Sequence, residues 1–375
     1  MSAARYPRSL ADLGPLSKGE ALVLEMAVAG EVARLSDDIL PDNGPDLVVR
    51  AGLIRFLLLG GSQEHPGHEK GVSVIGARIT GALDLELCTV AGRLNLWSCD
   101  IREGINLHAA AIGGLSLDGS EMSHLQASHL EVKGSVHMRR GFVADGGVDL
   151  NGARIGGQLG CNGGRFMNPD GQALTAQGAV INGDVLFRDG FQAEGAVNLS
   201  GAILRGQLEC VRGSMRAEED SAFALQGTKV AEIFYWRDMD VAAGNVVLTG
   251  ADIGALADDT KSWPEDGRLM MDGFRYGRFV YTDTTARRRL RWLAKHTSNA
   301  FQPQPYQQLA RVIGEMGQRY DRGKVLIEME ERLRVQQRRD MRAGGNRVHA
   351  WARPGWNGLR AGLHWVWDRL LRLVV

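Results

Sequence analysis

The chain has 375 residues, and 44% of them are hydrophobic. It contains 49 glycines, a larger share of the chain than the roughly 7% that is usual in soluble proteins. No apolar run reaches the 18 or so residues of a membrane-spanning helix, and the first residues contain no apolar signal-peptide core, so we expect a cytoplasmic protein. The zero net charge hides a division, because residues 280–375 carry 19 Lys and Arg against 8 Asp and Glu. Residues 1–279 are therefore acidic, and the end of the chain is basic.

The N-terminal segment, residues 1–69, predicts a helical cap. Ser17 and Glu20 have the spacing of a capping box, and the sequence EALVLEMAVAGEVARL that starts at Glu20 has the apolar spacing of a helix. The sequence GPDLVVRAGLIRFLLLGG, residues 44–61, predicts a second helix. We expect the core-facing residues of this second helix to be Val48, Leu53, Phe56 and Leu57.

A short repeat fills residues 70–279. The stretch GVDLNGARIGG shows its template, with large apolar residues at offsets 0 and 2, small residues at 4 and 5, and an apolar residue at 7. These positions are held there by Val148, Leu150, Gly152, Ala153 and Ile155. About 18 such units follow one another. A nucleotide-binding glycine turn would occur once, between a strand and a long helix, so the recurrence argues against that interpretation.

The spacing of the repeat predicts a mainly β fold. Offsets 0 and 2 lie on one face of a short strand, and offsets 5 and 7 lie on one face of the next strand, after a corner of small residues. Two units would close a four-sided coil of about 20 to 25 residues, and about nine coils would stack at the roughly 4.8 Å spacing of strands. We therefore expect a right-handed parallel β-helix between helical ends.

Several stretches carry a resemblance to known proteins. ARITG and ARIGG resemble the steps of pentapeptide-repeat proteins, whose fold is a right-handed four-sided β-helix. The order of VVRAGLIRFLLLGG, GARITGALDL and LADDTKSWPEDGRLMMDGFRYGRF is similar to that of an uncharacterised group of bacterial β-solenoid proteins related to that class. The resemblance implies a C-terminal membrane-associated region, and some members are labelled membrane-associated oxidoreductases. The sequence contains no cofactor motif that supports this label, so we expect no cofactor, metal or catalytic residue.

Residues 280–345 predict a helical hairpin. Pro305 fits the start of one helix, and Gly317 fits the turn before the next. The apolar residues that recur three and four apart are Leu309, Val312, Ile313, Met316, Val325, Leu326, Met329 and Leu333. The pair resembles one tetratricopeptide-like hairpin, which binds a helix of a partner or packs on its own domain.

The thiols and imidazoles of the repeat give no pattern of a reactive site. The cysteines take inward positions at offset 5 or offset 2, and they are Cys88, Cys99, Cys161 and Cys210. We therefore expect buried thiols that pack as small hydrophobic side chains. The histidines take different offsets, so we expect no stack among His108, His124, His129 and His137.

Acidic residues gather in three loops that we expect along one edge of the solenoid. Their members are Asp170, Glu218, Glu219, Asp220, Glu265 and Asp266. Such carboxylates either keep the solenoid soluble and prevent edge pairing, or dock a basic partner, or bind a divalent ion. We call this set the acidic edge.

The last segment, residues 346–375, is basic and rich in tryptophan, and its end GLHWVWDRLLRLVV is apolar but too short to span a bilayer. The residues that we expect to contact a membrane are Trp351, Arg353, Trp356, Arg360, Trp365, Trp367, Arg369, Leu370, Leu371 and Arg372. Basic residues with tryptophan also suit nucleic acid, but the apolar end favours a membrane surface. A helix folded back on the solenoid is the other alternative.

These patterns together predict a non-catalytic scaffold. We expect it to bind an unidentified protein partner and to be held at the cytoplasmic face of a membrane by its basic end. Two alternatives stay open. One is an acidic rod that mimics DNA and binds a DNA-binding protein, and the other is an enzyme, an oxidoreductase or a hydrolase, that uses the acidic edge.

Overall fold

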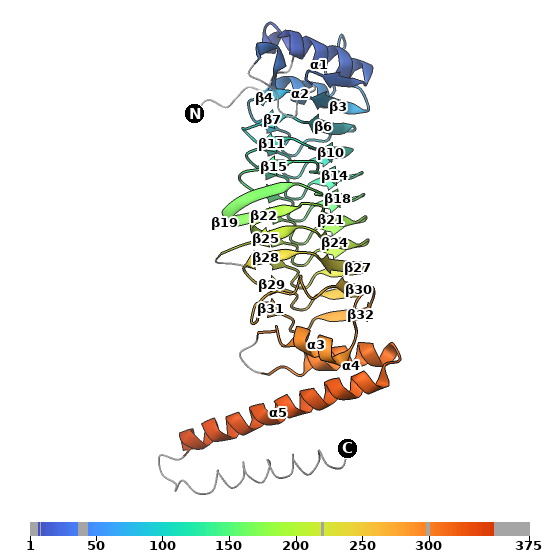
Figure 1. Cartoon of the computed structure of the whole chain (residues 1–375). Helices are drawn as coiled ribbons and strands as arrows, with labels where there is room; N and C mark the ends of the chain where they lie inside the picture. The colour runs from blue at the N-terminus through green and yellow to red at the C-terminus, as the bar shows by residue number, and fades with distance from the viewer. Residues whose placement is uncertain (1–6, 8, 37–43, 219–220, 298–300, 349–375) are drawn as a thin grey trace. The chain divides into compact units, whose positions relative to one another are not determined.

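The fold is described from a computed structural model of the chain (Figure 1). The structure describes residue 7 and residues 9–36, 44–218, 221–297 and 301–348. The chain divides into two compact units, residues 1–283 with 294–296, and residues 284–293 with 297–375. The first unit contains the repeat and the second contains three helices.

The repeat forms four ladders of strands, and every pairing within them is parallel. The first ladder contains β1 (Val32–Arg34), β3 (Gly71–Ile75), β6 (Arg93–Trp97), β10 (Gly114–Ser116), β14 (Val136–His137), β18 (Leu159–Gly160), β21 (Val185–Arg188), β24 (Leu208–Val211) and the second parts of β27 (Lys229–Arg237), β30 (Asp252–Asp258) and β32 (Arg275–Phe279). The second ladder contains β2 (Val48–Arg50), β4 (Arg78–Thr80), β7 (Asp100–Ile101), β11 (Glu121–Met122), β15 (Val143–Ala144), the first parts of β19 (Arg165–Thr175) and β22 (Gln192–Asn198), β25 (Ser214–Arg216) and β28 (Asp240–Ala243).

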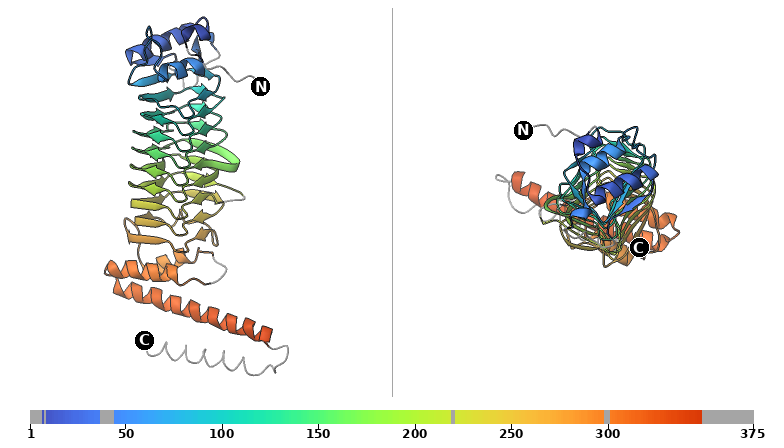
Figure 2. Two further views of the ribbon diagram at one scale, coloured as in Figure 1. Left: turned by 180° about the vertical axis from the view of Figure 1, so that it is seen from behind. Right: turned by 90° about the horizontal axis from the view of Figure 1, so that it is seen from above.

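The other two ladders complete each coil. The third ladder contains β5 (Leu83–Asp84), β8 (Ile105–Asn106), β12 (Leu125–Gln126), β16 (Val148–Asp149), the second parts of β19 and β22, β26 (Phe223–Ala224), β29 (Val246–Val247) and β31 (Leu269–Met270). The fourth ladder contains β9 (Ala111–Ile112), β13 (Glu131–Val132), β17 (Arg154–Ile155), β20 (Val180–Ile181), β23 (Ile203–Leu204) and the first parts of β27, β30 and β32. The predicted parallel β-solenoid of about nine coils is confirmed. Figure 2 shows the stack of coils from behind and from above.

The solenoid interior is filled by ladders of apolar side chains in register. Leu94 pairs with Leu115, which pairs with Val136, and each of these side chains is at most 1% exposed. Ile155 is also 1% exposed, between its ladder partners Val132 and Ile181. Burial of such side chains contributes about 1.5–3 kcal/mol each, so the inward positions of the repeat stabilise the stack.

Glycine at one corner allows consecutive coils to approach closely. The backbone N–H of Gly134 donates to the carbonyl oxygen of Gly113 at 2.9 Å, and the N–H of Gly113 donates to Gly92 at 2.8 Å. A Cβ added at Gly113 would lie 2.8 Å from the Gly92 oxygen, closer than real Cβ contacts allow. This corner accounts for part of the high glycine content.

The N-terminal segment corrects the prediction of two uninterrupted helices. The capping box of Ser17 and Glu20 is present, but α1 (Lys18–Ala29) ends at Gly30, which has a φ of 69°. The next residues form β1 rather than more helix, because β1 pairs with β3 of the first coil. The short turns η1 (Leu10–Leu13) and η2 (Pro45–Leu47) are 3-10 helices.

The second predicted helix is also shorter than expected. It begins as the strand β2, which pairs with β4, and only α2 (Ala51–Leu58) is helical. Leu53, Phe56 and Leu57 are buried as predicted, whereas Val48 is half-buried because it belongs to the strand. β1 and β2 thus cover two strand edges of the first coil, which would otherwise be free to pair with other chains.

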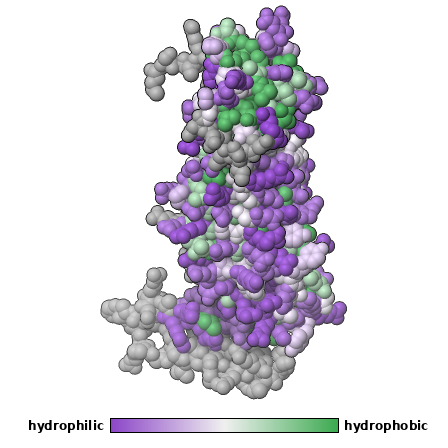
Figure 3. Space-filling view, turned by 45° about the horizontal axis from the view of Figure 1, so that its top comes forward, coloured by the Kyte–Doolittle hydropathy of each residue, from purple (hydrophilic) through white to green (hydrophobic). Residues whose placement is uncertain are grey.

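A buried ion pair ties the cap together. Glu20 is 2% exposed and accepts hydrogen bonds from Arg50 Nε at 2.6 Å and from the backbone N–H of Ser17 at 3.1 Å. Burial alone would raise the pKa of Glu20, but the hydrogen bonds from Arg50 and Ser17 outweigh it and lower that pKa. Figure 3 shows hydrophobic residues gathered at this end of the unit, whereas the visible flank of the solenoid is mostly hydrophilic.

The second unit contains the predicted helices. They are α3 (Ala286–Leu293), α4 (Gln304–Glu315) and α5 (Arg319–Val348). Pro305 lies in the first turn of α4, and Gly317 adopts a φ of 85° between α4 and α5, as predicted. Val312 and Val325 are fully buried, whereas Met316 is 38% exposed. Within the described residues, the helices are too short or too polar to cross a bilayer.

Candidate functional site

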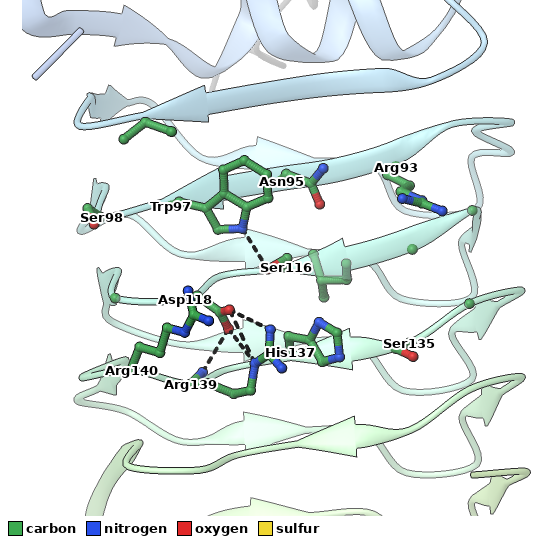
Figure 4. A pocket seen from close by; sticks show the side chains of 16 residues that line it. Arg93, Asn95, Trp97, Ser98, Ser116, Asp118, Ser135, His137, Arg139 and Arg140 are labelled. Carbon is green, nitrogen blue, oxygen red and sulfur yellow. Dashed lines mark hydrogen bonds and ion pairs between the residues drawn. The ribbon is translucent and has the colours of Figure 1, made fainter. Parts of the chain in front are cut away.

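A groove lies on the outer face of the first ladder of the solenoid. It has a volume of about 680 Å³ and is lined by Ile75 and by residues of the next three coils, within 93–98, 113–119 and 134–140 (Figure 4). We call it the first-ladder groove. It is open along the flat face of the sheet, so it suits an extended ligand better than a compact ligand that needs an enclosed pocket.

The groove exists because the outward residues of its central strand β10, Gly114 and Ser116, are small. Asn95, Ser116 and His137 stand in register on neighbouring strands, and His137 pairs with Gly160 of the following coil. Gly114, which pairs with Arg93, leaves the floor of the groove without a side chain. The inward neighbours of these residues are apolar and buried, so the groove does not interrupt the packing of the core.

An aromatic ring forms one side of the groove. The Nε1–H of Trp97 donates to Ser116 Oγ at 2.7 Å, and Asn95 Nδ2 donates to Ser73 Oγ at 2.9 Å. Figure 4 shows the Trp97 ring lying along the sheet with Nε1 directed at Ser116. The hydrogen bond fixes the edge of the indole, so a face of the ring is left for contact with a ligand.

An ion pair lies at the same end of the groove, on the two following strands. Arg139 binds Asp118 through Nη2 at 2.8 Å and Nε at 3.2 Å, and the backbone N–H of Arg139 donates to the same carboxylate at 3.1 Å. The Asp118 side chain is 10% exposed and that of Arg139 is 29% exposed. The carboxylate is therefore neutralised within the protein.

Three further groups of the groove have unused binding capacity. Within the described residues, Arg93 and Arg140 form no ion pair or side-chain hydrogen bond, and Nε2 of His137 is buried without a partner. Burial, and next the charge of Arg139, lower the pKa of His137, so its ring is neutral near pH 7. The groove thus combines two free guanidinium groups with a neutral imidazole.

The described members of the acidic edge lie in three segments of the first unit. Asp170 lies in β19, Glu218 follows β25, and the loop with Glu265 and Asp266 precedes β31. These loops all lead into strands of the third ladder. Glu219 and Asp220 lie outside the described residues.

Most described carboxylates of the acidic edge are paired with basic side chains of the same unit. Glu218 lies 2.7 Å from Arg216, Glu265 lies 3.4 Å from Arg268, and Asp266 lies 2.9 Å from Lys295. Each of these three carboxylates is more than 70% exposed, so such pairs contribute little to stability. The pairs reduce the negative charge that the edge presents to a basic partner.

The cysteines are inward-facing with one correction. Cys99, Cys161 and Cys210 are fully buried, and burial raises the pKa of Cys99 to about 12 and also raises the pKa values of Cys161 and Cys210. Cys88 is only half-buried, and Nη2 of Arg55 lies 4.0 Å from its sulfur. Three of the four thiols are therefore poor nucleophiles.

The histidines differ in part from expectation. The rings of His108 and His129 lie 6.0 Å apart in an edge-to-face arrangement, so one histidine pair does form, and His137 lines the groove. Within the described ranges, no three His, Cys, Asp or Glu side chains converge as a metal site requires. The residues predicted to contact a membrane, 351–372, lie outside the part of the chain that the structure describes.

The sequence was compared with known proteins, and it matches no protein-family model, no curated protein and no solved structure. The sequence patterns did not predict the first-ladder groove, because the repeat template specifies the inward positions and not the outward residues of neighbouring coils. The available signal was a run of small outward residues, Gly114, Ser116 and Ser135, beside Trp97 and arginines.

Proposed function

We propose that the chain is a non-catalytic scaffold that presents the outer faces of its solenoid to a protein partner. The filled interior supports this proposal most strongly. Inward ladder positions such as Leu94 and Leu115 are at most 1% exposed, so the coils are occupied by their own side chains. Outward positions vary from coil to coil, and the first-ladder groove and the acidic edge lie there.

We further propose that the basic end of the chain holds this scaffold at the cytoplasmic face of a membrane, as in the bacterial pentapeptide-repeat-like proteins that the chain resembles. The support is the sequence of residues 346–375, whose arginines and tryptophans suit an anionic interface. Arginines near such a surface contribute about 1 kcal/mol each, and tryptophan and leucine add apolar burial.

Sedimentation with anionic vesicles tests the membrane part. We expect the full chain to sediment with the vesicles, and we expect a chain that ends at residue 350 to stay in solution. Salt should weaken the binding without abolishing it, because apolar burial is not screened. Equal sedimentation of both chains, or steeply salt-dependent binding to duplex DNA by both, would contradict the proposal.

The alternatives have less support. A DNA mimic needs an unneutralised acidic surface, whereas three described carboxylates of the acidic edge pair with Arg216, Arg268 and Lys295. A thiol-based oxidoreductase needs an accessible thiolate, whereas Cys99, Cys161 and Cys210 are buried with raised pKa values.

A further inference from the structure

The first-ladder groove is a positive area on an acidic body. Arg93 and Arg140 are unpaired within the described residues, whereas Arg139 and Asp118 neutralise one another. Residues 1–279 carry 11 more acidic than basic residues, given the 19 basic and 8 acidic residues of 280–375 and an overall charge of zero. The local field thus favours an anionic ligand, but the surrounding charge disfavours a long polyanion such as nucleic acid.

The positions of the two free arginines set the length of that ligand. Arg93 pairs with Gly114, and Ser135 stands at the same position one strand further, because Leu115 pairs with Val136. Arg140 follows Ser135 by five residues, which is at most about 16 Å because the chain turns at Arg140 (φ 57°), and two strand spacings add about 10 Å across. The two Cα atoms are therefore at most about 19 Å apart, which five or six residues of extended peptide can span.

The groups between the arginines suit a peptide. Trp97 presents a ring face for an aromatic or proline side chain. The His137 ring also lines the groove and adds a polar side chain between the arginines. The groove lies on the face of the sheet, where backbone groups are already paired, so recognition must come from side chains.

We propose that the first-ladder groove binds a short extended segment of the partner protein with two acidic side chains about five residues apart. One carboxylate pairs with Arg93 and the other with Arg140, and an apolar ring between them rests on Trp97. Guanidinium groups bind carboxylates in bidentate geometry, which selects carboxylates over amides. The inference rests on the proposed scaffold function and specifies the partner's chemistry.

Arrays of octapeptides test this inference with the full chain. One array fixes glutamate at the second and seventh positions and varies the residues between them, and the matched array carries glutamine instead. We expect binding to the glutamate array only, with tyrosine, tryptophan or proline enriched between the glutamates. Equal binding to the two arrays, or no binding to either, would overturn the proposal.

Variants locate the binding in the groove. Arg93→Gln and Arg140→Gln should each weaken binding of a selected fluorescent peptide by about three- to tenfold. Gly114→Val should block the floor, and its added Cβ would meet only the flexible Arg93 side chain, at 3.3 Å. Arg154→Gln removes an exposed arginine of the fourth ladder and should leave binding unchanged.

The remaining outcomes are distinguishable from failure of the proposed function. If the groove variants bind the peptide as well as the parent does, the groove assignment is wrong. Binding of an oligoglucuronate at the groove without any peptide binding would also overturn it. The doubly substituted Arg93→Gln, Arg140→Gln chain should still sediment with anionic vesicles, so loss of peptide binding alone leaves the membrane test unaffected.

Discussion

The outer face of the first ladder differs between its early and its later coils, whereas its inner face is apolar in both. In its early coils, the outward residues Asn95, Ser116 and His137 frame a groove, whereas in later coils Leu186, Glu209 and Tyr235 fill the same column. The inward neighbours are apolar throughout. The fold therefore constrains what points inward and leaves the outward positions free, so binding surfaces can differ between coils of the same repeat.

Ile155→Asp tests the inner face and should have the largest effect. Its side chain is 1% exposed, and a buried carboxylate without a partner should cost about 3–5 kcal/mol of folding free energy. Chemical denaturation would measure the loss. Arg154→Gln, on the exposed side of the same strand, should change the free energy of unfolding by less than about 0.5 kcal/mol. Similar losses from both variants would contradict the division between faces.

The inward positions could be predicted from sequence because each of them recurs in every coil. Val148, Leu150 and Ile155 fall at offsets that only an inward strand face explains, and all are buried. The groove could not be predicted in this way, because it depends on which outward residues become neighbours. Ser116 and His137 are 21 residues apart, and the template does not specify their register.

The ends were predicted less well than the middle for a related reason. Helical spacing alone cannot show that Val32–Arg34 and Val48–Arg50 pair with the first coil. The acidic residues were predicted to share an edge, and their loops do lead into one ladder. Their ion pairs were not predicted. Arg216 and Arg268 are close sequence neighbours of Glu218 and Glu265, whereas Lys295 lies 29 residues after Asp266 and is brought to it only by the fold.

The rates of thiol labelling compare the half-buried Cys88 with the three buried cysteines. Cys88 is half-buried, whereas Cys99, Cys161 and Cys210 are buried. We expect iodoacetamide to label Cys88 of the native protein faster than the other three, by about two orders of magnitude or more, because those three react only when the coils open. Peptide mass spectrometry would measure the rates, with protein in denaturant as the control. Rapid labelling of Cys161 or Cys210 in the folded state would revive a redox function.

The loss of stability on breaking one ion pair at each site compares the groove with the acidic edge. Asp118→Ala leaves Arg139 without its partly buried partner and should reduce the free energy of unfolding by about 1–3 kcal/mol. Glu218→Ala breaks an exposed pair with Arg216, and its effect should stay below about 0.5 kcal/mol. A double-mutant cycle with Arg139→Ala separates the pair from the single groups. Equal effects at the two sites would show that burial does not distinguish them.

The smallest effect should come from the neutral imidazole in the groove. The pKa of His137 in the folded chain is lowered by burial and by Arg139, with Arg140 adding to this and Asp118 opposing it. The unfolded chain therefore binds more protons as the pH falls below about 6.5, the ordinary pKa of histidine, so stability is lost in that range.

His137→Gln should remove this part of the acid sensitivity. We expect the difference in free energy of unfolding between pH 7.5 and 5.5 to be smaller in the variant than in the parent, by less than about 1 kcal/mol. Arg154→Gln, which leaves the groove unchanged, should follow the parent. A variant as acid-sensitive as the parent would mean that His137 is not held neutral in the groove.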